Sequence, residues 1–179
     1  MPELRNSLLL QLDARDRALF SRWALSAAAS PSSLRLWRVV THLGGATSAI
    51  ATVLVPLLFA TNRSARVAAE LGAWSLAVSH LVVQLVKRSI GRTRPELARC
   101  GRSSVEMPDR FSFPSGHACA AMAVAFAYGM SAPAVALPLM VLAAIVGLSR
   151  VRLGVHYPGD VLAGQGIAIL TVLAFWTLG

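Results

Sequence analysis

A run of about 30 residues without a charged side chain, from Ala118 to Leu148, constrains the fold of this chain more than any other feature. Uncharged segments of this length belong in a lipid bilayer, where each crossing takes about 20 apolar residues. As one straight helix, the run would separate its two ends by roughly 45 Å at ~1.5 Å per residue. Pro133 suits the first turn of a new helix. We therefore expect a hairpin of two helices that turns at Ser131-Ala132-Pro133 and returns the chain to the same membrane face.

The overall composition agrees with a membrane protein. Of 179 residues, 55% are hydrophobic and 14% are charged, with a mean hydropathy of +0.60. The net charge of +9 indicates basic residues beside membrane spans, which set topology and meet anionic lipid, rather than nucleic-acid binding. The length indicates one domain. Because charged residues interrupt the first apolar residues, no secretory signal peptide is expected.

The apolar segments predict an all-α fold, a multi-span transmembrane helical bundle with about five spans. The expected spans cover residues 39–60, 67–86, about 115–131, 133–149 and about 158–178. Residues 1–36 carry Leu4, Leu8, Leu12, Leu19 and Trp23 on roughly one helical face. Arg22 would cost a few kcal/mol at a bilayer centre, so this segment is interpreted as an amphipathic interfacial helix, with a polar tail as the alternative. A polar, Arg-rich loop is expected over 88–112.

Polar residues cluster where these spans end on one membrane face. Lys87 ends the second span, Arg94 follows in the loop, and Arg150 ends the fourth span. Three cations beside a serine hydroxyl make an anion site, for which a tetrahedral phosphate is the natural ligand. Ser115 and Gly116 precede a helix, whose first backbone N–H groups point at the same anion. Gly116 permits close approach of the backbone.

Two histidines and an aspartate complete the cluster. His156 and Asp160 flank the start of the last span, so the carboxylate is expected to hold one imidazole N–H and fix its tautomer. A histidine oriented in this way beside a phosphate is a candidate nucleophile. His117 remains as a general acid for the leaving alkoxide or as a base for water. Ionisable groups are rare in this region, which makes the joint cluster a functional-site candidate.

Two further features stay open. His80, Gln84 and Lys87 share one helical stripe, which either lines a polar cavity leading to the site or makes interhelical hydrogen bonds. Cys100 and Cys119 show no metal-binding spacing, and they can pair only if their side faces an oxidising compartment.

The spacing of the polar cluster is similar to a known signature. Lys87-x6-Arg94-Pro95, then Pro114-Ser115-Gly116-His117, then Ser149-Arg150-x5-His156-x3-Asp160 resembles the three-part motif of the type 2 phosphatidic acid phosphatase (PAP2) family, with all parts in order. The five-span plan is similar to the small bacterial members, including those that act on undecaprenyl diphosphate. The signature covers residues 87–160, and earlier residues match only in their hydrophobic plan.

The resemblance implies a single PAP2-like membrane domain over 1–179, with 1–36 as the amphipathic segment and 37–179 as the catalytic bundle. It implies a phosphatase without metal or other cofactor. His156 forms a phosphohistidine, Asp160 orients it, and His117 protonates the leaving group. The resemblance assigns phosphate binding to Lys87, Arg94, Ser115, Gly116 and Arg150.

The expected substrate is a lipid phosphate, because the site lies at the membrane face of a bilayer-buried body. The candidates are polyprenyl phosphate or diphosphate, phosphatidate and phosphatidylglycerophosphate, and a second phosphate held by the Arg-rich loop would favour a diphosphate. Soluble vanadium haloperoxidases share the signature, but the spans argue against that class. A lipid phosphotransferase of the same family and a non-catalytic lipid or anion carrier remain alternatives, and a purely structural subunit would need no such cluster.

The expected location is the bacterial cytoplasmic membrane, with the side of the site left open. The excess of arginine on the site side places that side in the cytoplasm. The family resemblance favours the outer face.

Overall fold

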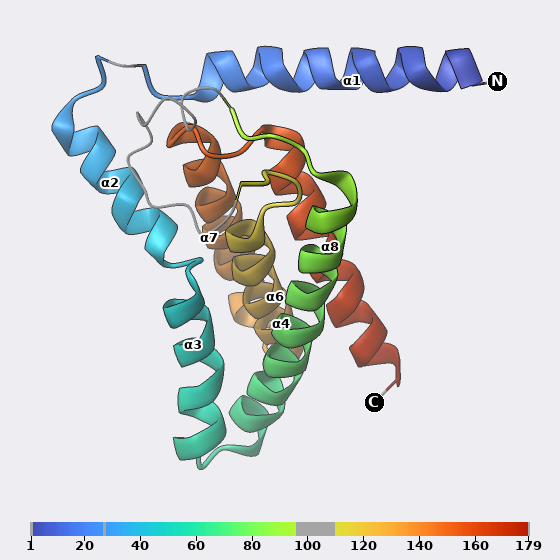
Figure 1. Ribbon diagram of the computed structural model, residues 1–179. Helices are drawn as coiled ribbons and strands as arrows, with labels where there is room; N and C mark the ends of the chain where they lie inside the picture. Colours follow the sequence, from blue (N-terminus) through green and yellow to red (C-terminus); the bar gives the residue numbers. More distant parts are fainter. Residues whose placement is uncertain (1, 27, 96–109, 179) are drawn as a thin grey trace.

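The computed structural model describes residues 2–26, 28–95 and 110–178, with the side chains of residues 2–9 excepted. Within these residues the chain forms helices joined by short connections (Figure 1). The helices are α1 (Pro2–Trp23), α2 (Pro31–His42), α3 (Ala46–Phe59), α4 (Arg63–Ile90), α6 (Gly116–Ser131), α7 (Pro133–Arg152) and α8 (Pro158–Leu178). The described part contains no β-strand, and its one isolated β-bridge pairs Thr93 with Phe111. The predicted all-α bundle is confirmed.

The predicted hairpin is confirmed at its turn. Helix α6 ends at Ser131, and α7 begins at Pro133, which occupies the first turn of the new helix. The neighbouring span α4 has clear capping residues at both ends. The side chain of Asn62 accepts a hydrogen bond from the Ser64 N–H at the start, and Gly91 ends the helix with a left-handed φ of 62°.

The predicted first span over 39–60 is interrupted rather than one helix. The chain instead forms α2 and α3, which meet at a bend of 42°. Gly44 lies in the break, where an added Cβ would come within 2.8 Å of the His117 carbonyl oxygen. The break thus allows the backbone to approach α6 closely. Helix α2 also begins at Pro31, so the expected boundary between residues 36 and 37 falls inside a helix.

Three helices of the described part, α4, α7 and α8, are long and apolar enough to cross a membrane, and the bent pair α2–α3 gives a fourth candidate. Helix α6 has 16 residues, about 24 Å at ~1.5 Å per residue. It is therefore shorter than the ~30 Å apolar layer of a bilayer. Figure 1 shows α6 enclosed by α4, α7 and α8, so its length is set by neighbours more than by lipid.

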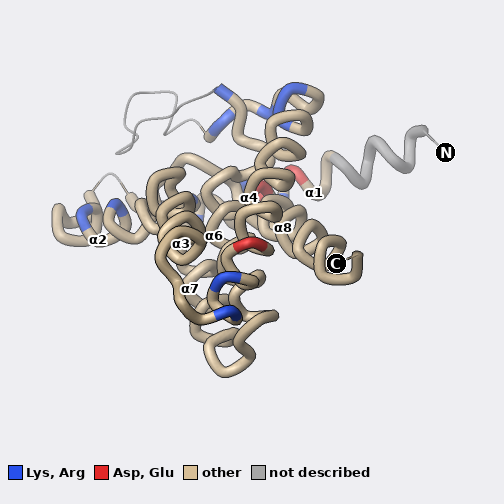
Figure 2. The backbone as a smooth tube through the Cα atoms, turned by 90° about the horizontal axis from the view of Figure 1, so that it is seen from below, with Lys and Arg blue, Asp and Glu red and all other residues tan. Residues whose placement is uncertain are grey.

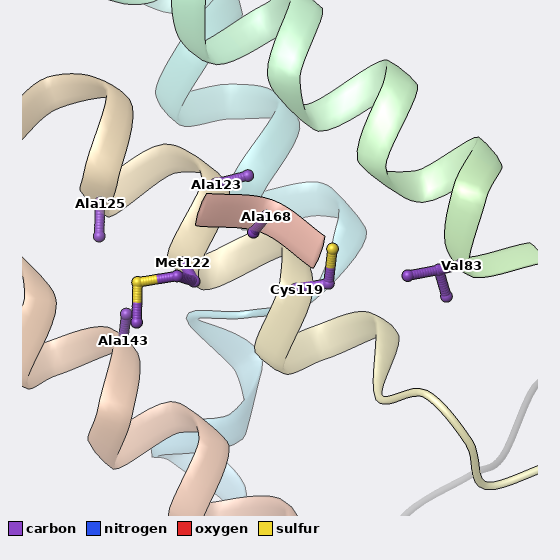
Figure 3. Packing of buried hydrophobic residues seen from close by; sticks show 7 residues of the cluster. All are labelled: Val83, Cys119, Met122, Ala123, Ala125, Ala143 and Ala168. Carbon is purple, nitrogen blue, oxygen red and sulfur yellow. The ribbon is translucent and has the colours of Figure 1, made fainter. Parts of the chain in front are cut away.

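Small side chains let these helices approach closely around α6. The core cluster contains Val83, Cys119, Met122, Ala123, Ala125, Ala143 and Ala168 (Figure 3). In Figure 3, Val83 of α4 points toward Cys119 of α6, and Met122 reaches toward Ala143 of α7. Lipid-facing bundles pack mainly through such small residues, because lipid tails offer no hydrophobic drive for helix association. Figure 2 shows few charged positions along the bundle helices.

Helix α1 lies across one end of the bundle instead of along it (Figure 1). Its apolar side chains Leu10, Leu12, Leu19 and Trp23 are exposed, and its role as an interfacial helix stays a prediction. Leu4 and Leu8 lie outside the side chains that the structure describes. Figure 2 shows acidic positions of α1 where this helix passes the bundle.

A glycine pair on α8 tests the packing against α6. An added Cβ at Gly164 would collide with the Ser115 carbonyl oxygen, whereas one at Gly166 would meet nothing within 4 Å. We expect Gly164→Ala to destabilise the protein by about 1–3 kcal/mol through overpacking. Thermal unfolding in detergent measures this, with Gly166→Ala on the same helix as the matched control. Equal melting temperatures for the two variants would contradict the packing described here.

Candidate active site

The polar residues predicted to form a site meet at the end of the bundle crossed by α1. Lys87 lies in the last turn of α4, Arg150 in the last turn of α7, and Asp160 in the first turn of α8. Arg94 and His156 come from the loops that follow α4 and α7. All five side chains are buried. Three of them, Lys87, Arg94 and Arg150, are cations, which are suitable groups for binding a phosphate.

The start of α6 supplies the neutral donors of this site. Ser115 is the N-cap residue, yet its side chain makes no capping hydrogen bond, and its buried Oγ has no hydrogen-bond partner among the described residues. A Cβ at Gly116 would meet nothing within 4 Å, so there is free space at the helix start. The first N–H groups of a helix and a free hydroxyl are suitable donors for a phosphate oxygen.

The imidazole of His156 has a defined tautomer. Its Nε2 lies 3.3 Å from Nη1 of Arg94, which also donates to the Val155 carbonyl oxygen at 2.9 Å. A guanidinium can only donate, so Nε2 must be the unprotonated acceptor, and the proton of the neutral ring sits on Nδ1. The lone pair of Nε2 therefore points toward Arg94, one of the cations predicted to bind phosphate.

Asp160 faces the other ring nitrogen. Its Oδ2 lies 3.6 Å from Nδ1 of His156, an ion-pair distance longer than a hydrogen bond. The same Oδ2 accepts the Tyr157 N–H at 2.8 Å. Burial lowers the pKa of His156 to about 4, with Arg150 and Arg94 acting in the same direction and Asp160 opposing them. The ring is therefore neutral at physiological pH, as a nucleophile must be.

His117 lies in the first turn of α6, next to the break between α2 and α3. A Cβ at Gly45 would be 3.9 Å from its Nε2. His117 follows Ser115 and Gly116 at the start of α6, at the same end of the bundle as Arg150 and His156. A second imidazole beside His156 is suited to proton transfer.

Sequence reasoning missed two residues of this region. Arg92 donates to Asp160 Oδ1 at 2.7 Å. It lies between Lys87 and Arg94, at a position to which the sequence motif gives no role. Thr41, buried at the end of α2, accepts a hydrogen bond of 2.7 Å from Arg150 Nη1. A single threonine in an apolar segment gives no signal, and nothing in one sequence links residue 41 with residue 150.

Of the helical stripe His80, Gln84 and Lys87, only Lys87 is buried at the site. Lys87 is buried, whereas His80 is exposed and shares a hydrogen bond of 3.2 Å with Gln84 of its own helix. That bond is within α4, so it is not the interhelical contact proposed for the pair. Cys119 is a buried free thiol in the core, and Cys100 lies outside the described residues. Among described residues, no group of three or more His, Cys, Asp or Glu side chains could hold a metal ion.

The chain is similar to several curated bacterial phosphatases. It is 41% identical over 91 residues to a decaprenylphosphoryl-5-phosphoribose phosphatase of Mycobacterium tuberculosis, which covers 50% of this chain and 49% of the relative. A lipid A 1-phosphatase of Rhizobium johnstonii is 32% identical over 120 residues, covering 59% and 47%. A phosphatidylglycerophosphatase B of Bacillus subtilis is 36% identical over 101 residues, covering 50% and 47%. The matches span about half the length of these relatives.

Solved structures show the same fold. The chain superposes on a transmembrane PAP2-type phosphatidylglycerolphosphate phosphatase from Bacillus subtilis with a TM-score of 0.73 and 22% identity, covering 94% of this chain and 86% of the other. Aquifex aeolicus LpxE gives a TM-score of 0.71 at 20% identity, covering 89% and 93%. The family model described as the PAP2 superfamily matches residues 71–179, which include every residue of the predicted signature. Matching this model over more than half of its length, the chain belongs to the PAP2 superfamily.

Proposed function

We propose that this protein is an integral membrane lipid phosphate phosphatase that works through a phosphohistidine on His156. The observation that carries the proposal is the buried contact between Arg94 and Nε2 of His156, 3.3 Å apart. An anion bound by this arginine would lie close to an unprotonated ring nitrogen. A binding protein or carrier needs the cations but does not need an imidazole oriented in this way.

The proposed reaction has two steps. Lys87, Arg94, Arg150, Ser115 and the backbone at Gly116 bind the phosphoryl oxygens and stabilise the charge of the transition state. Nε2 of His156 attacks phosphorus as the P–O bond to the lipid breaks, and His117 gives the leaving oxygen its proton. Asp160 stabilises the charge that develops on the imidazole ring. His117 then takes a proton from water, whose oxygen attacks phosphorus, and the N–P bond breaks to release inorganic phosphate.

The proposed substrates follow from the bilayer-embedded fold and from the names of the relatives. Those names include phosphatases of decaprenylphosphoryl-5-phosphoribose, lipid A and phosphatidylglycerophosphate, and an undecaprenyl-diphosphatase. All are phosphates or diphosphates at the head of a large apolar group. We place the protein in the bacterial cytoplasmic membrane, acting as a single domain on a lipid of this class.

Replacement of His156 tests the nucleophile. We expect phosphate release from at least one member of a panel of polyprenyl phosphate, polyprenyl diphosphate, phosphatidate and phosphatidylglycerophosphate, with EDTA present. His156→Ala should lower that release by about 10⁴-fold or more, because the covalent step is lost. The matched control is His80→Ala, an exposed histidine on α4. Activity that survives in His156→Ala, or that EDTA abolishes, would contradict the mechanism.

Replacement of His117 tests the proton donor. In His117→Ala we expect the first step with a lipid phosphate to slow by about 10²–10⁴-fold, because the alkoxide must leave without its proton. A good leaving group needs no acid, so p-nitrophenyl phosphate should still give a burst of one equivalent of nitrophenol, followed by slow turnover. Rapid-quench kinetics measure both. Equal slowing of the first step for both substrates would exclude the general-acid role.

The protonation state of His156 is directly measurable. Because burial and the neighbouring arginines lower its pKa to about 4, the ring should lose its neutral form only as the pH falls through that value. NMR of histidine-labelled protein in micelles gives the titration, with His156→Ala identifying the signal. A midpoint at or above the ordinary value of about 6.5 would contradict the buried, cation-flanked environment.

A further inference from the structure

Arg92 lies at the centre of a charged network outside the phosphate-binding residues. Its Nη1 donates to Asp160 Oδ1 and to Asp16 Oδ2, each at 2.7 Å, and its Nη2 donates to Asp13 Oδ1 at 2.8 Å. The side chain is 18% exposed. One guanidinium therefore joins two carboxylates of α1 to the carboxylate that faces His156.

This network leaves Asp160 little freedom to rotate. Arg92 occupies Oδ1, while Oδ2 accepts the Tyr157 N–H and faces Nδ1 of His156 at 3.6 Å. The bond from Arg92 thus decides which carboxylate oxygen points to the imidazole. Without it, the carboxylate is free to rotate, because no other hydrogen bond holds Oδ1 among the described residues.

Helix α1 also holds the start of α8 directly. Asp16 Oδ1 accepts the Gly159 N–H at 2.7 Å and so caps the first turn of α8 from another helix. The ring of Tyr157 lies between the two elements, with the Arg92 guanidinium 4.2 Å from its centroid and the Phe20 ring at 5.2 Å. The segment that carries the catalytic pair is therefore packed against α1.

Electrostatics favour this arrangement. Burial alone would lower the pKa of Arg92, but attraction to Asp160 and the hydrogen bonds to Asp16 and Asp13 raise it above its ordinary value. Hydrogen bonds from Arg17 and Arg92 likewise hold the pKa of Asp13 below its usual range, against the effect of burial. Arg92 and Asp13 therefore stay charged near neutral pH, and partial burial strengthens their attraction.

We propose that Arg92 is a positioning residue that holds Asp160 toward His156, and that α1 orients Arg92 through Asp13 and Asp16. Docking of α1 on the bundle is then required for full turnover. The inference rests on the proposed phosphohistidine at His156. Arg92 touches no substrate group in this account, because three of its five N–H donors already bind carboxylates.

The test compares Arg92→Gln, Arg92→Lys, Asp16→Asn and the double variant Asp16→Asn/Arg92→Gln in the full-length protein in detergent. A displaced catalytic group costs up to about 100-fold in rate, so we expect Arg92→Gln to lower kcat by about 10- to 100-fold with KM unchanged. Arg92→Lys should recover part of the loss, because it keeps the charge but not the fork of donors. The control is Arg15→Gln, an exposed position on α1, the helix that carries Asp16.

The double variant separates positioning from a general effect on stability. If Asp16 acts through Arg92, the double variant should lose no more kcat than Arg92→Gln alone. Losses that multiply, or a rise in KM at constant kcat, would overturn the proposal. If Arg92→Gln does not fold, Asp16→Asn decides: wild-type kcat in that nearly isosteric variant would equally overturn it.

His156→Ala in the same assay distinguishes the two levels of the account. Loss of activity in His156→Ala with wild-type behaviour of Arg92→Gln and Asp16→Asn would refute the positioning role alone. Activity retained in His156→Ala would refute the proposed function, whatever the Arg92 variants show.

Discussion

The structure depends on the burial of charged groups at one end of an apolar helical bundle. Lys87, Arg94 and Arg150 are each at most 5% exposed, and each lies at the end of a helix or just beyond it. Burial of charged groups is costly and must be offset by ion pairs and hydrogen bonds. In the proposed function, the apolar helices hold the lipid, while the polar end supplies the chemistry. The connections between spans are therefore the functional part of the chain.

Two opposed chemical demands are met within this small region. The phosphate-binding cations must face the substrate, whereas Asp160 must stay ionised and keep its orientation beside His156. The structure separates them by giving the carboxylate its own cation, Arg92, which is in turn held by Asp13 and Asp16. A helix that lies across the bundle end thus contributes to a site whose signature residues all come later in the chain.

Sequence patterns predicted those parts of the molecule that depend on local chemistry. The turn before Pro133 followed from one proline in an uncharged run, and the clustering of Lys87, Arg150 and Asp160 followed from helix lengths alone. The bend between α2 and α3 was missed because it depends on the close approach of Gly44 to His117. These two residues are far apart in the sequence. The same reason hid the links from Arg92 to α1 and from Thr41 to Arg150. Contacts of this kind depend on tertiary packing, which one sequence does not display.

The most direct test of the central claim is to locate the phosphoryl group during turnover. His117→Ala, reacted with p-nitrophenyl phosphate and quenched in alkali, should accumulate a covalent intermediate that mass spectrometry of peptides can map. The account predicts phosphate on His156, attached at Nε2, because Nδ1 carries the proton and faces Asp160. Phosphate on another residue, or attached at Nδ1, would contradict it. A complete absence of phosphoenzyme beside a normal nitrophenol burst would likewise exclude a covalent path through His156.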